Sequence, residues 1–519
     1  MNSSNFNTTG RVLQVEIITM ALTYPLRLGV LAYVGPAFDS ARNDIRNKYP
    51  LLNVTQTLIH GGNAPYSDWL AQYENILAFY YYRKRPFSPE RLPDVTAIVM
   101  AGADDTIGVG QFATQLDKLF ITSVAQAPDV RNKEKWPTWI TTSGISRTAF
   151  RMMFENLVRM FSWSIVSIVC DVNSNSFFEN VSDYIKQVLL STLPNAQVTR
   201  LVFDSRKSDM DYEKLLQFIK NTSRVVLYWG HSGALHKLLI TAARINMTQG
   251  DYVFLAFLPF RHVSFGNFGW DVPDNSSAEN DAGFKCLLII ESLPVRGKGQ
   301  GENITQMQSQ WMKRSKELDN NTYIPGETVS PHPMSTYMSM MALAEVVDDI
   351  RQEIATSSHV SADEFSGRKI AARFMNRTFS MSEQTESLTI DKVGERIVPM
   401  AVTQLDTETG KISVVLEQDA RLRLRSAGRV VWPNVWPVPN RPLCGFRGEA
   451  SACQKNEYSR LQYGVGSGMA LLLAIMITSV LVYLRLVQSR RSADIWWVME
   501  PILLRVSSTQ NNKLADSRR

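Results

Sequence analysis

Residues 223–257 read SRVVLYWGHSGALHKLLITAARINMTQGDYVFLAF and contain two short apolar runs on either side of a longer segment. The run Arg224–Trp229 ends at a Gly-His-Ser turn, which favours a buried strand. Gly233–Ile245 has the length of a helix, and Tyr252–Leu258 is again a short apolar run. Two buried strands joined through a helix pair in parallel, because a parallel connection needs a crossover of about a dozen residues. This stretch therefore predicts a βαβ unit whose sheet is covered on both faces.

The same pattern continues on both sides of this unit. Residues 149–161 predict another helix, and four further short apolar runs predict strands. These predicted strands are Arg27–Val34, Val95–Met100, Ile165–Cys170 and Cys286–Ile290. Together they make too many units for one lobe of ordinary size. We expect an α/β fold in which residues 26–440 form two doubly wound parallel-sheet lobes.

One segment, Leu461–Leu484, carries no charged residue. A helix of 24 residues reaches about 36 Å, which is enough to cross a hydrocarbon core of about 30 Å. The basic residues that border it are Arg460 before it and Arg485, Arg490 and Arg491 after it. By the positive-inside rule, we expect a single transmembrane helix at 461–484 and a short cytoplasmic tail at 485–519. This topology implies a plasma-membrane protein with an extracellular N-terminal region.

Asn-x-Ser/Thr sequons occur only before the predicted transmembrane helix, which agrees with this orientation. Their asparagines are Asn2, Asn7, Asn53, Asn180, Asn221, Asn246, Asn275, Asn303, Asn320 and Asn376. An extracellular region also needs a signal sequence. Near the N-terminus the only apolar stretch is Val15–Leu22, which is short and contains Glu16. We assign residues 1–25 to an N-terminal segment with a weak or missing signal peptide.

Several motifs in order resemble one receptor family. In WPTWITTSGISRTAFRMMFENLVRMFSWSIVSIVCD, residues 136–171, the positions Pro137, Thr138, Phe161 and Trp163 are in the family's register. Residues 223–257 carry the family's Gly-x-Ser, Ala-Ala-Arg and Gly-Asp-Tyr-Val-Phe elements. The segment TIDKVGER at 389–396 matches the family's I-D-x-x-G-x-R turn. The segment PLCGFRGEASAC at 442–453 resembles the juxtamembrane cysteine motif of receptor cyclases. From about Leu26 to Cys453, the chain resembles the extracellular ligand-binding region of natriuretic peptide receptors and receptor-type guanylate cyclases. The resemblance implies a type I periplasmic-binding-protein-like fold, an extracellular ligand between two lobes and a homodimer.

Ligands of open α/β sheets lie beyond the carboxyl ends of the strands, where loops meet helix N-termini. We predict that residues at such positions contact an extracellular peptide or small molecule. In the first lobe they are Gly102, Asp104, Asp105 and Thr106; in the second lobe they are His231 and Ser232; after the crossing between lobes they are Thr142, Ser143 and Ser146. A plain helix N-cap or turn explains each group as well, so both alternatives stay open.

The four cysteines fall into two kinds. Cys444 and Cys453 lie in a polar loop, residues 441–460, on the oxidising side of the membrane, and we expect a disulfide between them. Cys170 and Cys286 fall in strand-like segments and are expected to be buried thiols. The loop MAGADDTIG, residues 100–108, lacks the cysteine that is often present there in the family that this chain resembles. We therefore expect no disulfide in the first lobe.

The sequence offers no catalytic motif. It contains no HExxH, no zinc-type cysteine spacing and no G-x-S-x-G, and GKGQG at 297–301 lacks the P-loop pattern. The net charge is +6, but the tail from Arg485 holds seven basic and three acidic residues, which leaves +2 for the other 484 residues. We expect no cofactor, no metal and no nucleic-acid partner. The leading hypothesis is a receptor without a catalytic domain in this chain, and the alternative is a truncated receptor guanylate cyclase.

Overall fold

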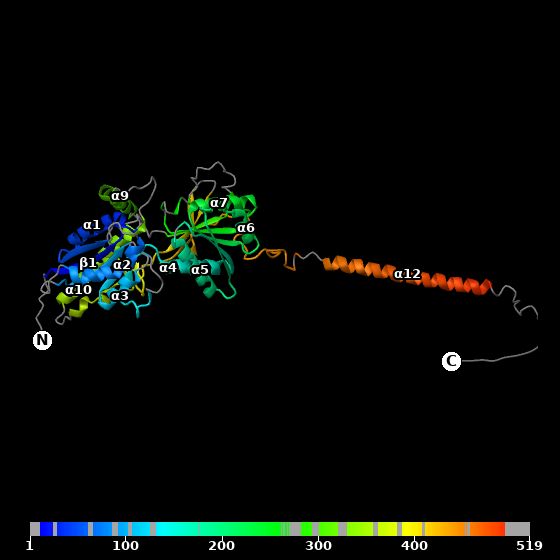
Figure 1. The fold of residues 1–519 in the computed structure, drawn as a ribbon, viewed down its shortest axis with the longest axis horizontal. Helices are drawn as coiled ribbons and strands as arrows, with labels where there is room; N and C mark the ends of the chain where they lie inside the picture. The colour runs from blue at the N-terminus through cyan, green and yellow to red at the C-terminus, as the bar shows by residue number, and fades with distance from the viewer. Residues whose placement is uncertain are drawn as a thin grey trace, which may run out of the picture. The chain divides into compact units, whose positions relative to one another are not determined.

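A computed structural model describes most of the chain. The described residues are 11–23, 29–60, 66–85, 92–101, 106–124, 131–174, 176–260, 262, 265–266, 268, 282–292, 300–319, 330–356, 362–380, 387–406, 411–451, 453 and 457–493. The chain divides into two compact units, Met1–Pro442 and Leu443–Arg519. The first unit contains two lobes, each built around its own sheet (Figure 1).

The first lobe is a parallel sheet of order β2-β1-β3-β4-β5 with helices on both faces. Its strands are β1 (Leu13–Ala21), β2 (Leu52–His60), β3 (Val95–Ala101), β4 (Leu119–Thr122) and β5 (Trp139–Thr141). One face packs against α1 (Leu31–Lys48), α10 (Pro331–Thr356) and α11 (Gly367–Phe374), with α9 (Gln300–Asp319) lying on α1. The other face packs against α2 (Tyr66–Phe79), the π-helix η1 (Tyr80–Lys84) and α3 (Ile107–Gln115). The lobe is completed by the 3-10 helix η5 (Ala362–Phe365) and the hairpin of β11 (Arg377–Phe379) and β12 (Leu388–Ile390).

Two sequence-based predictions for this lobe are wrong. The strand predicted at Arg27–Val34 is wrong for its described residues, because those from Leu31 belong to helix α1 (Leu31–Lys48), whose apolar residues from Val34 to Ile45 recur at helical spacing. Instead, the stretch Val15–Leu22, which we assigned to the N-terminal segment, largely coincides with β1, an interior strand of the sheet. We considered this stretch only as a signal sequence, which Glu16 weakens, and predicted no strand there. In the fold the charge of Glu16 is neutralised by Arg85, whose Nε lies 3.2 Å from Glu16 Oε1 and whose Nη2 contacts Oε2.

The second lobe is a mixed sheet of order β15-β14-β13-β10-β9-β8-β6-β7. Its parallel strands are β6 (Ile165–Asp171), β7 (Gln197–Phe203), β8 (Val225–Trp229), β9 (Val253–Leu258) and β10 (Leu287–Ser292). Its helices are α4 (Arg147–Met160), α5 (Ser176–Thr192), α6 (Tyr212–Lys220) and α7 (Ser232–Arg244). The antiparallel strands β13 (Met400–Leu405), β14 (Ile412–Gln418) and β15 (Leu424–Ser426) extend one edge.

The strands predicted near 95, 165, 224, 252 and 286 are confirmed as β3, β6, β8, β9 and β10, and the two-lobe α/β class is confirmed with them. The antiparallel edge was not predicted, because β14 and β15 mix buried and exposed residues in short runs. The chain passes from the first lobe to the second after β5, returns after β10 and passes again after β12. These crossings set the relative position of the two lobes.

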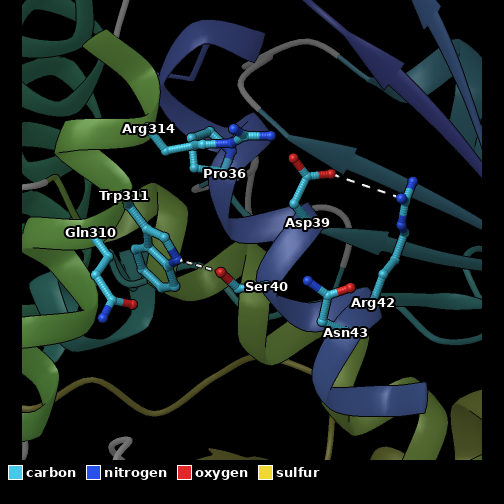
Figure 2. Close-up of a pocket in the computed structure, with 8 residues that line it drawn as sticks. All are labelled: Pro36, Asp39, Ser40, Arg42, Asn43, Gln310, Trp311 and Arg314. Carbon is cyan, nitrogen blue, oxygen red and sulfur yellow. Dashed lines mark hydrogen bonds and ion pairs between the residues drawn. The ribbon is translucent and has the colours of Figure 1, made fainter. Parts of the chain in front are cut away.

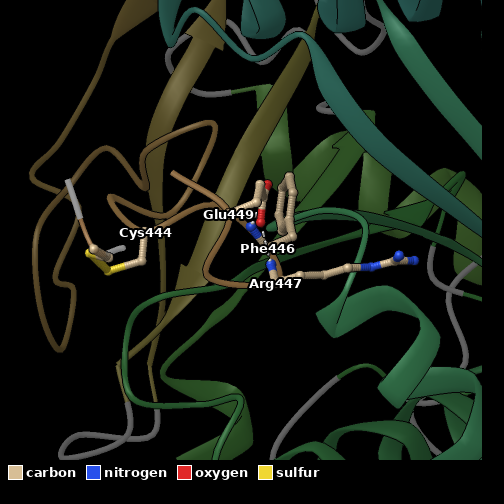
Figure 3. The surroundings of a disulfide bond; sticks show 5 residues. Cys444, Phe446, Arg447 and Glu449 are labelled. Carbon is tan, nitrogen blue, oxygen red and sulfur yellow. Dashed lines mark hydrogen bonds between the residues drawn. A yellow bond between two sulfur atoms is a disulfide. The ribbon is translucent and has the colours of Figure 1, made fainter. Parts of the chain in front are cut away.

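The second unit contains the disulfide loop and one long helix. Cys444 and Cys453 are paired as expected. Within the loop, the Glu449 carboxylate accepts hydrogen bonds from the backbone N–H groups of Phe446 and Arg447, at 3.2 and 2.7 Å (Figure 3). The helix α12 (Glu457–Ala493) is, within the described part of the chain, the helix that is long and apolar enough to cross a membrane, over Tyr463–Arg491.

Candidate ligand-binding site

A cavity of about 350 Å³ lies at the carboxyl edge of the second sheet. It is lined by loop residues that follow β6, β7 and β8, by the start of α6 and by the first two turns of α7. The lining residues are Asn173, Ser174, Ser205, Tyr212, His231, Gly233, Ala234 and Lys237. This is the edge of an open α/β sheet at which ligands bind. One residue from the sequence prediction, His231, lines it.

The buried carboxylate of Asp171 organises the floor of this cavity. Asp171 ends β6 and is fully buried. Its Oδ2 accepts a hydrogen bond from Ser205 Oγ at 2.6 Å, and its Oδ1 accepts from the N–H groups of Ser205 and Asn173 at 3.1 and 3.3 Å. The loops after β6 and β7 are therefore held together before any ligand arrives.

His231 is held in one orientation at the start of α7. Its Nδ1 accepts a hydrogen bond from Gly233 N at 3.1 Å, and its carbonyl accepts one from the Tyr228 hydroxyl at 2.9 Å. Because Nδ1 is the acceptor in this bond, the neutral ring carries its proton on Nε2 and can donate it to a ligand. Ser232 is buried and faces the loop at Gly266, where a Cβ would approach its Oγ to 2.1 Å. Ser232 does not line the cavity.

Two further side chains supply hydrogen-bond donors to the same cavity. The Tyr212 hydroxyl is buried and has no hydrogen-bond partner within the described residues. Burial and the nearby Asp171 carboxylate raise its pKa, so the hydroxyl keeps its proton near neutral pH. Lys237 is exposed and has no ion pair in the described part of the chain. With His231, these groups suit a carbonyl or an anionic group, and they do not form a nucleophile with an adjacent base.

Sequence reasoning missed Tyr212, Ser205 and Lys237 for identifiable reasons. Strand β7, which precedes Ser205, reads QVTRLVF and is mostly half-buried, so its end was not recognised. Tyr212 is the first residue of α6, and Lys237 lies in the second turn of α7. Polar residues in the first turns of helices after predicted strands were the available signal.

In the first lobe, Gly102, Asp104 and Asp105 lie outside the described residues. Thr106 is buried and is the N-cap residue of α3, and its carbonyl accepts a hydrogen bond from Gly110 N at 2.9 Å. Thr106 fits the N-cap alternative by position, although its side chain makes no capping hydrogen bond to α3. Ligand contact by these residues stays a prediction.

The three residues after the crossing have internal partners. Thr142 Oγ1 lies 2.6 Å from Ser339 Oγ on α10. Ser143 Oγ accepts from Ile145 N at 3.1 Å. Ser146 Oγ caps α4 by accepting from Ala149 N at 3.1 Å. All three are buried where the chain crosses between the lobes, and ligand contact by them stays a prediction. We refer to residues 142–146 as the hinge turn.

The hinge turn is tied to the crossing that follows β12, residues 391–396. Asp391 Oδ1 accepts hydrogen bonds from the N–H groups of Val393 and Glu395, each at 2.9 Å, and Gly394 adopts a positive φ of 76°. The Glu395 carboxylate then accepts from Ser146 Oγ at 2.8 Å. Arg131 lies 3.2 Å from Asp391 and 3.1 Å from Glu395. The TIDKVGER turn is therefore part of the hinge.

An aromatic contact joins the lobes next to this hinge. The Phe260 ring, which follows β9, meets the His332 ring in the first turn of α10 edge to face, with centroids 5.8 Å apart. His332 Nδ1 lies 3.5 Å from the carbonyl of Ser123. Burial, with the nearby His262, lowers the pKa of His332 from 6.5 to about 4. A neutral imidazole therefore packs between the lobes near neutral pH.

Other residue predictions have mixed outcomes. Cys170 and Cys286 are free and buried, as expected. Five sequon asparagines are described and exposed, which leaves them accessible to glycosylation: Asn53, Asn180, Asn221, Asn246 and Asn376. Asn2, Asn7, Asn275, Asn320 and the side chain of Asn303 lie outside the described residues. Among the described residues, no group of histidine, cysteine and acidic side chains is arranged to hold a metal ion.

The model of the receptor family ligand binding region matches residues 33–408, which is more than half of the chain. Atrial natriuretic peptide receptor 3 of Mus musculus is 22% identical over 333 residues, and that of Bos taurus is 24% identical over 337 residues; each alignment covers 62% of this chain and 58% of the relative. Atrial natriuretic peptide receptor 2 of Bos taurus is 22% identical over 297 residues, covering 55% of this chain and 27% of the relative. The chain thus spans a little over half the length of the first of these relatives, and it belongs to the family defined by the receptor ligand-binding region.

Proposed function

We propose that this chain is a single-pass plasma-membrane receptor that binds an extracellular peptide or small molecule between its two lobes. The observation that carries the proposal is the cavity at the carboxyl edge of the second sheet, in a chain of the receptor family. Its lining comes from the second lobe alone, so it supports that lobe's part of the site. Donors from Tyr212, His231 and Lys237 converge on it, so the bound part of the ligand carries a carbonyl or an acidic group. The described part of the chain acts by binding rather than by catalysis.

The proposed membrane topology rests on α12 and on the side of the chain that carries sequons. The helix has an uncharged stretch long enough to span the bilayer, followed by Arg485, Arg490 and Arg491. We expect removal of N-linked glycans from the surface-expressed chain to lower its apparent mass. A chain that carries no glycan and is inaccessible to surface labelling would contradict this topology.

We also propose that the receptor works as a homodimer, either signalling by rearrangement or sequestering its ligand. Support comes from an exposed aromatic surface on the first lobe, where Phe79 and Tyr82 are 56% and 64% exposed. The rings of Tyr81 and Tyr82 pack edge-on against Phe112 of α3. Exposed apolar patches of this kind mark interaction sites. In detergent, we expect Phe79→Ser with Tyr82→Ser to reduce the mass of the full chain from dimer to monomer.

The binding proposal is tested with the full chain on the surface of cells. Because the relatives are named natriuretic peptide receptors, labelled natriuretic peptides are the first probes, followed by small carboxylic acids. We expect Lys237→Ala or Tyr212→Phe to weaken saturable binding about tenfold, since each removes a hydrogen bond to a polar or charged group. Lys214→Ala, at an exposed lysine on α6 that does not line the cavity, is the matched control. If the unmodified chain and the three variants bound the ligand with equal affinity, this cavity would not be part of the binding site.

A further inference from the structure

The last segment of the second lobe, residues 430–440, crosses the edge of the sheet at which the parallel strands begin. We call this segment the strap and this edge the amino edge. Near the start of the strap, Gln404 Nε2 of β13 donates a hydrogen bond to the Val431 carbonyl at 2.6 Å, and Val431 N donates to Gln404 Oε1 at 3.0 Å. Next, Trp432 Nε1 donates to the carbonyl of Gly250, in the loop before β9, at 2.9 Å. The start of the strap is therefore fixed to two places on the amino edge.

The end of the strap is fixed where β6 begins. Trp163 Nε1 donates a hydrogen bond to the carbonyl of Val438 at 2.8 Å. Asn440 Oδ1 accepts hydrogen bonds from Ser164 N and Ile165 N, each at 2.9 Å, and Asn440 Nδ2 donates to Ser164 Oγ at 2.8 Å. The strap therefore runs from β13 past β9 to β6, along the edge opposite to the cavity proposed as the ligand-binding site.

The strap has an inner and an outer face. Its inner side chains pack against the core of the second lobe: Val430, Trp432, Trp436 and Val438. Its exposed residues, apart from Asn434, are all apolar: Val431, Pro433, Val435, Pro437 and Pro439. Val431 and Val435 are 70% and 63% exposed. An exposed apolar face on a segment that is held in place marks an interaction surface.

The cavity between α1 and α9 of the first lobe, of about 440 Å³, offers no comparable surface. Within it, Asp39 and Arg42 form an ion pair at 3.9 Å, and Trp311 Nε1 donates to Ser40 Oγ at 2.9 Å (Figure 2). Polar groups of this cavity thus bind one another, whereas the outer face of the strap is apolar and exposed.

Arginines flank the outer face of the strap. Arg429 comes directly before the strap and Arg441 directly after it, and both are exposed. Residues 426–448 contain no acidic side chain, and neither arginine forms an ion pair with another described residue. Guanidinium groups bind phosphate oxygens through paired hydrogen bonds. An apolar face between two arginines therefore fits the headgroup region of a phospholipid bilayer, where apolar side chains and phosphates meet.

The chain itself ties the strap to the membrane in the single-pass topology proposed above. Only residues 443–462 separate the second lobe from Tyr463, where the apolar stretch of α12 begins. The disulfide shortens this path, because the Cα atoms of Cys444 and Cys453 lie 5.1 Å apart. A short tether gives lipid a high effective concentration at the strap, whereas a soluble partner has to be captured from solution. This difference favours phospholipid as the partner of the outer face.

We propose that the outer face of the strap lies on the outer leaflet of the membrane. Val431 and Val435 enter the interface, and Arg429 and Arg441 bind lipid phosphates. Because the strap is bound to the amino edge, this contact leaves the ligand-binding edge of the sheet on the side turned away from the lipid. The inference rests on the proposed membrane topology, and its test separates the two.

The test is fluorescence quenching on the full chain, reconstituted in nanodiscs of phosphatidylcholine. A nitrobenzoxadiazole fluorophore is attached through Val431→Cys or Val435→Cys. Ser208→Cys, on the exposed turn after β7 at the opposite edge of the sheet, is the matched control, and Met476→Cys in α12 reports insertion. The native cysteines do not take the fluorophore, because two are buried and the other two are paired.

Phosphatidylcholine with a nitroxide on its headgroup quenches fluorophores that lie in the headgroup region. We expect at least about twofold quenching in Val431→Cys and Val435→Cys and almost none in Ser208→Cys, because only the strap lies on lipid. Equal quenching in all three variants, or none in the two strap variants, overturns the proposal. A nitroxide deep in the acyl chains should quench Met476→Cys; if it does not, the proposed topology fails and this inference fails with it.

Charge variants test the part of the arginines. In the chain labelled at Val435→Cys, replacing Arg429 and Arg441 by alanine is expected to remove about half or more of the quenching, since the guanidinium–phosphate bonds are lost. Replacing both by lysine should keep part of it, because lysine keeps the charge without the planar fork. The control, Arg421→Ala with Lys207→Ala, removes two exposed charges at the opposite edge and should leave the quenching unchanged. Equal losses in the two double alanine variants, or no loss in either, overturn the lipid contact of the arginines.

Discussion

The Glu395 carboxylate accepts a hydrogen bond from the Ser146 hydroxyl at 2.8 Å, across 249 positions of sequence. It also accepts from Thr148 Oγ1 and, at 3.3 Å, from Thr148 N. Ser146 and Thr148 begin the first helix of the second lobe, and Glu395 follows the last strand of the first lobe. One carboxylate thus joins two crossings between the lobes and caps the helix that leaves the hinge.

Glu395→Gln should destabilise the hinge. The amide keeps the size of the side chain, but it loses the ion pair with Arg131 and one acceptor oxygen. We expect a loss of about 2 kcal/mol in the free energy of unfolding, typical of hydrogen bonds to a charged group. Denaturant titration of the full chain checks this. Glu417→Gln, in an exposed pair with Arg425, should lose less than about 1 kcal/mol; losses of equal size would contradict the hinge role.

Arg85→Ala should destabilise the first lobe strongly. Glu16 is only 1% exposed and depends on Arg85 for neutralisation, with Thr96 Oγ1 as a further donor at 3.1 Å. Removal of one partner of a buried pair costs about 3–5 kcal/mol, because a charge is left in the core. Thermal unfolding measures the loss. Adding Glu16→Gln to Arg85→Ala should restore part of the stability, and a double variant less stable than the single one would argue against this explanation.

Acidification should weaken the contact between the lobes through His332. Its pKa is lowered to about 4 in the fold, by burial first and by His262 second, against 6.5 in the unfolded chain. Between these values the unfolded chain binds the extra proton, so stability falls as the pH drops from about 6.5 towards 4. A pKa difference of this size corresponds to about 3 kcal/mol.

The matched variants for this pH effect are His332→Gln and His60→Gln. His60 is exposed at the end of β2, so its loss should leave the pH dependence of unfolding as in the unmodified chain. His332→Gln should flatten the profile between pH 6.5 and 4, measured by denaturant titration at fixed ionic strength. A profile that keeps its slope in His332→Gln would assign the effect to other groups.

Thiol labelling should distinguish the two kinds of cysteine. Cys170 and Cys286 are buried, and burial raises the pKa of both thiols, that of Cys286 to about 11. Because the thiolate is the reactive form, neither should react with a maleimide in the native chain. Mass spectrometry should find no label before reduction, two labels at Cys444 and Cys453 after mild reduction, and four after denaturation with reduction. Rapid native labelling at Cys170 or Cys286 would contradict their burial.

Local pattern was sufficient for much of the fold. Continuous apolar runs such as Val95–Met100 and Ile165–Cys170 predicted strands buried on both faces, and the segment around 461–484 predicted the helix that can span a membrane. Local pattern did not predict strand β1 at Val15–Leu22, because the partner that neutralises Glu16 is Arg85, 69 residues away. A charge inside an apolar run cannot be interpreted until its partner is known.

In the candidate site, too, some features follow from local sequence and others only from the tertiary structure. The sequence by itself determined the βαβ units, the strand ends that carry His231, the pairing of Cys444 with Cys453 and the apolar helix, because each depends on spacing and composition within a few dozen residues. Only the tertiary structure decided that Ser146 pairs with Glu395 and that Tyr212 and Lys237 line the same cavity as His231. Those roles depend on which strand ends the sheet order brings together, and pairing between distant segments leaves no signal in local periodicity.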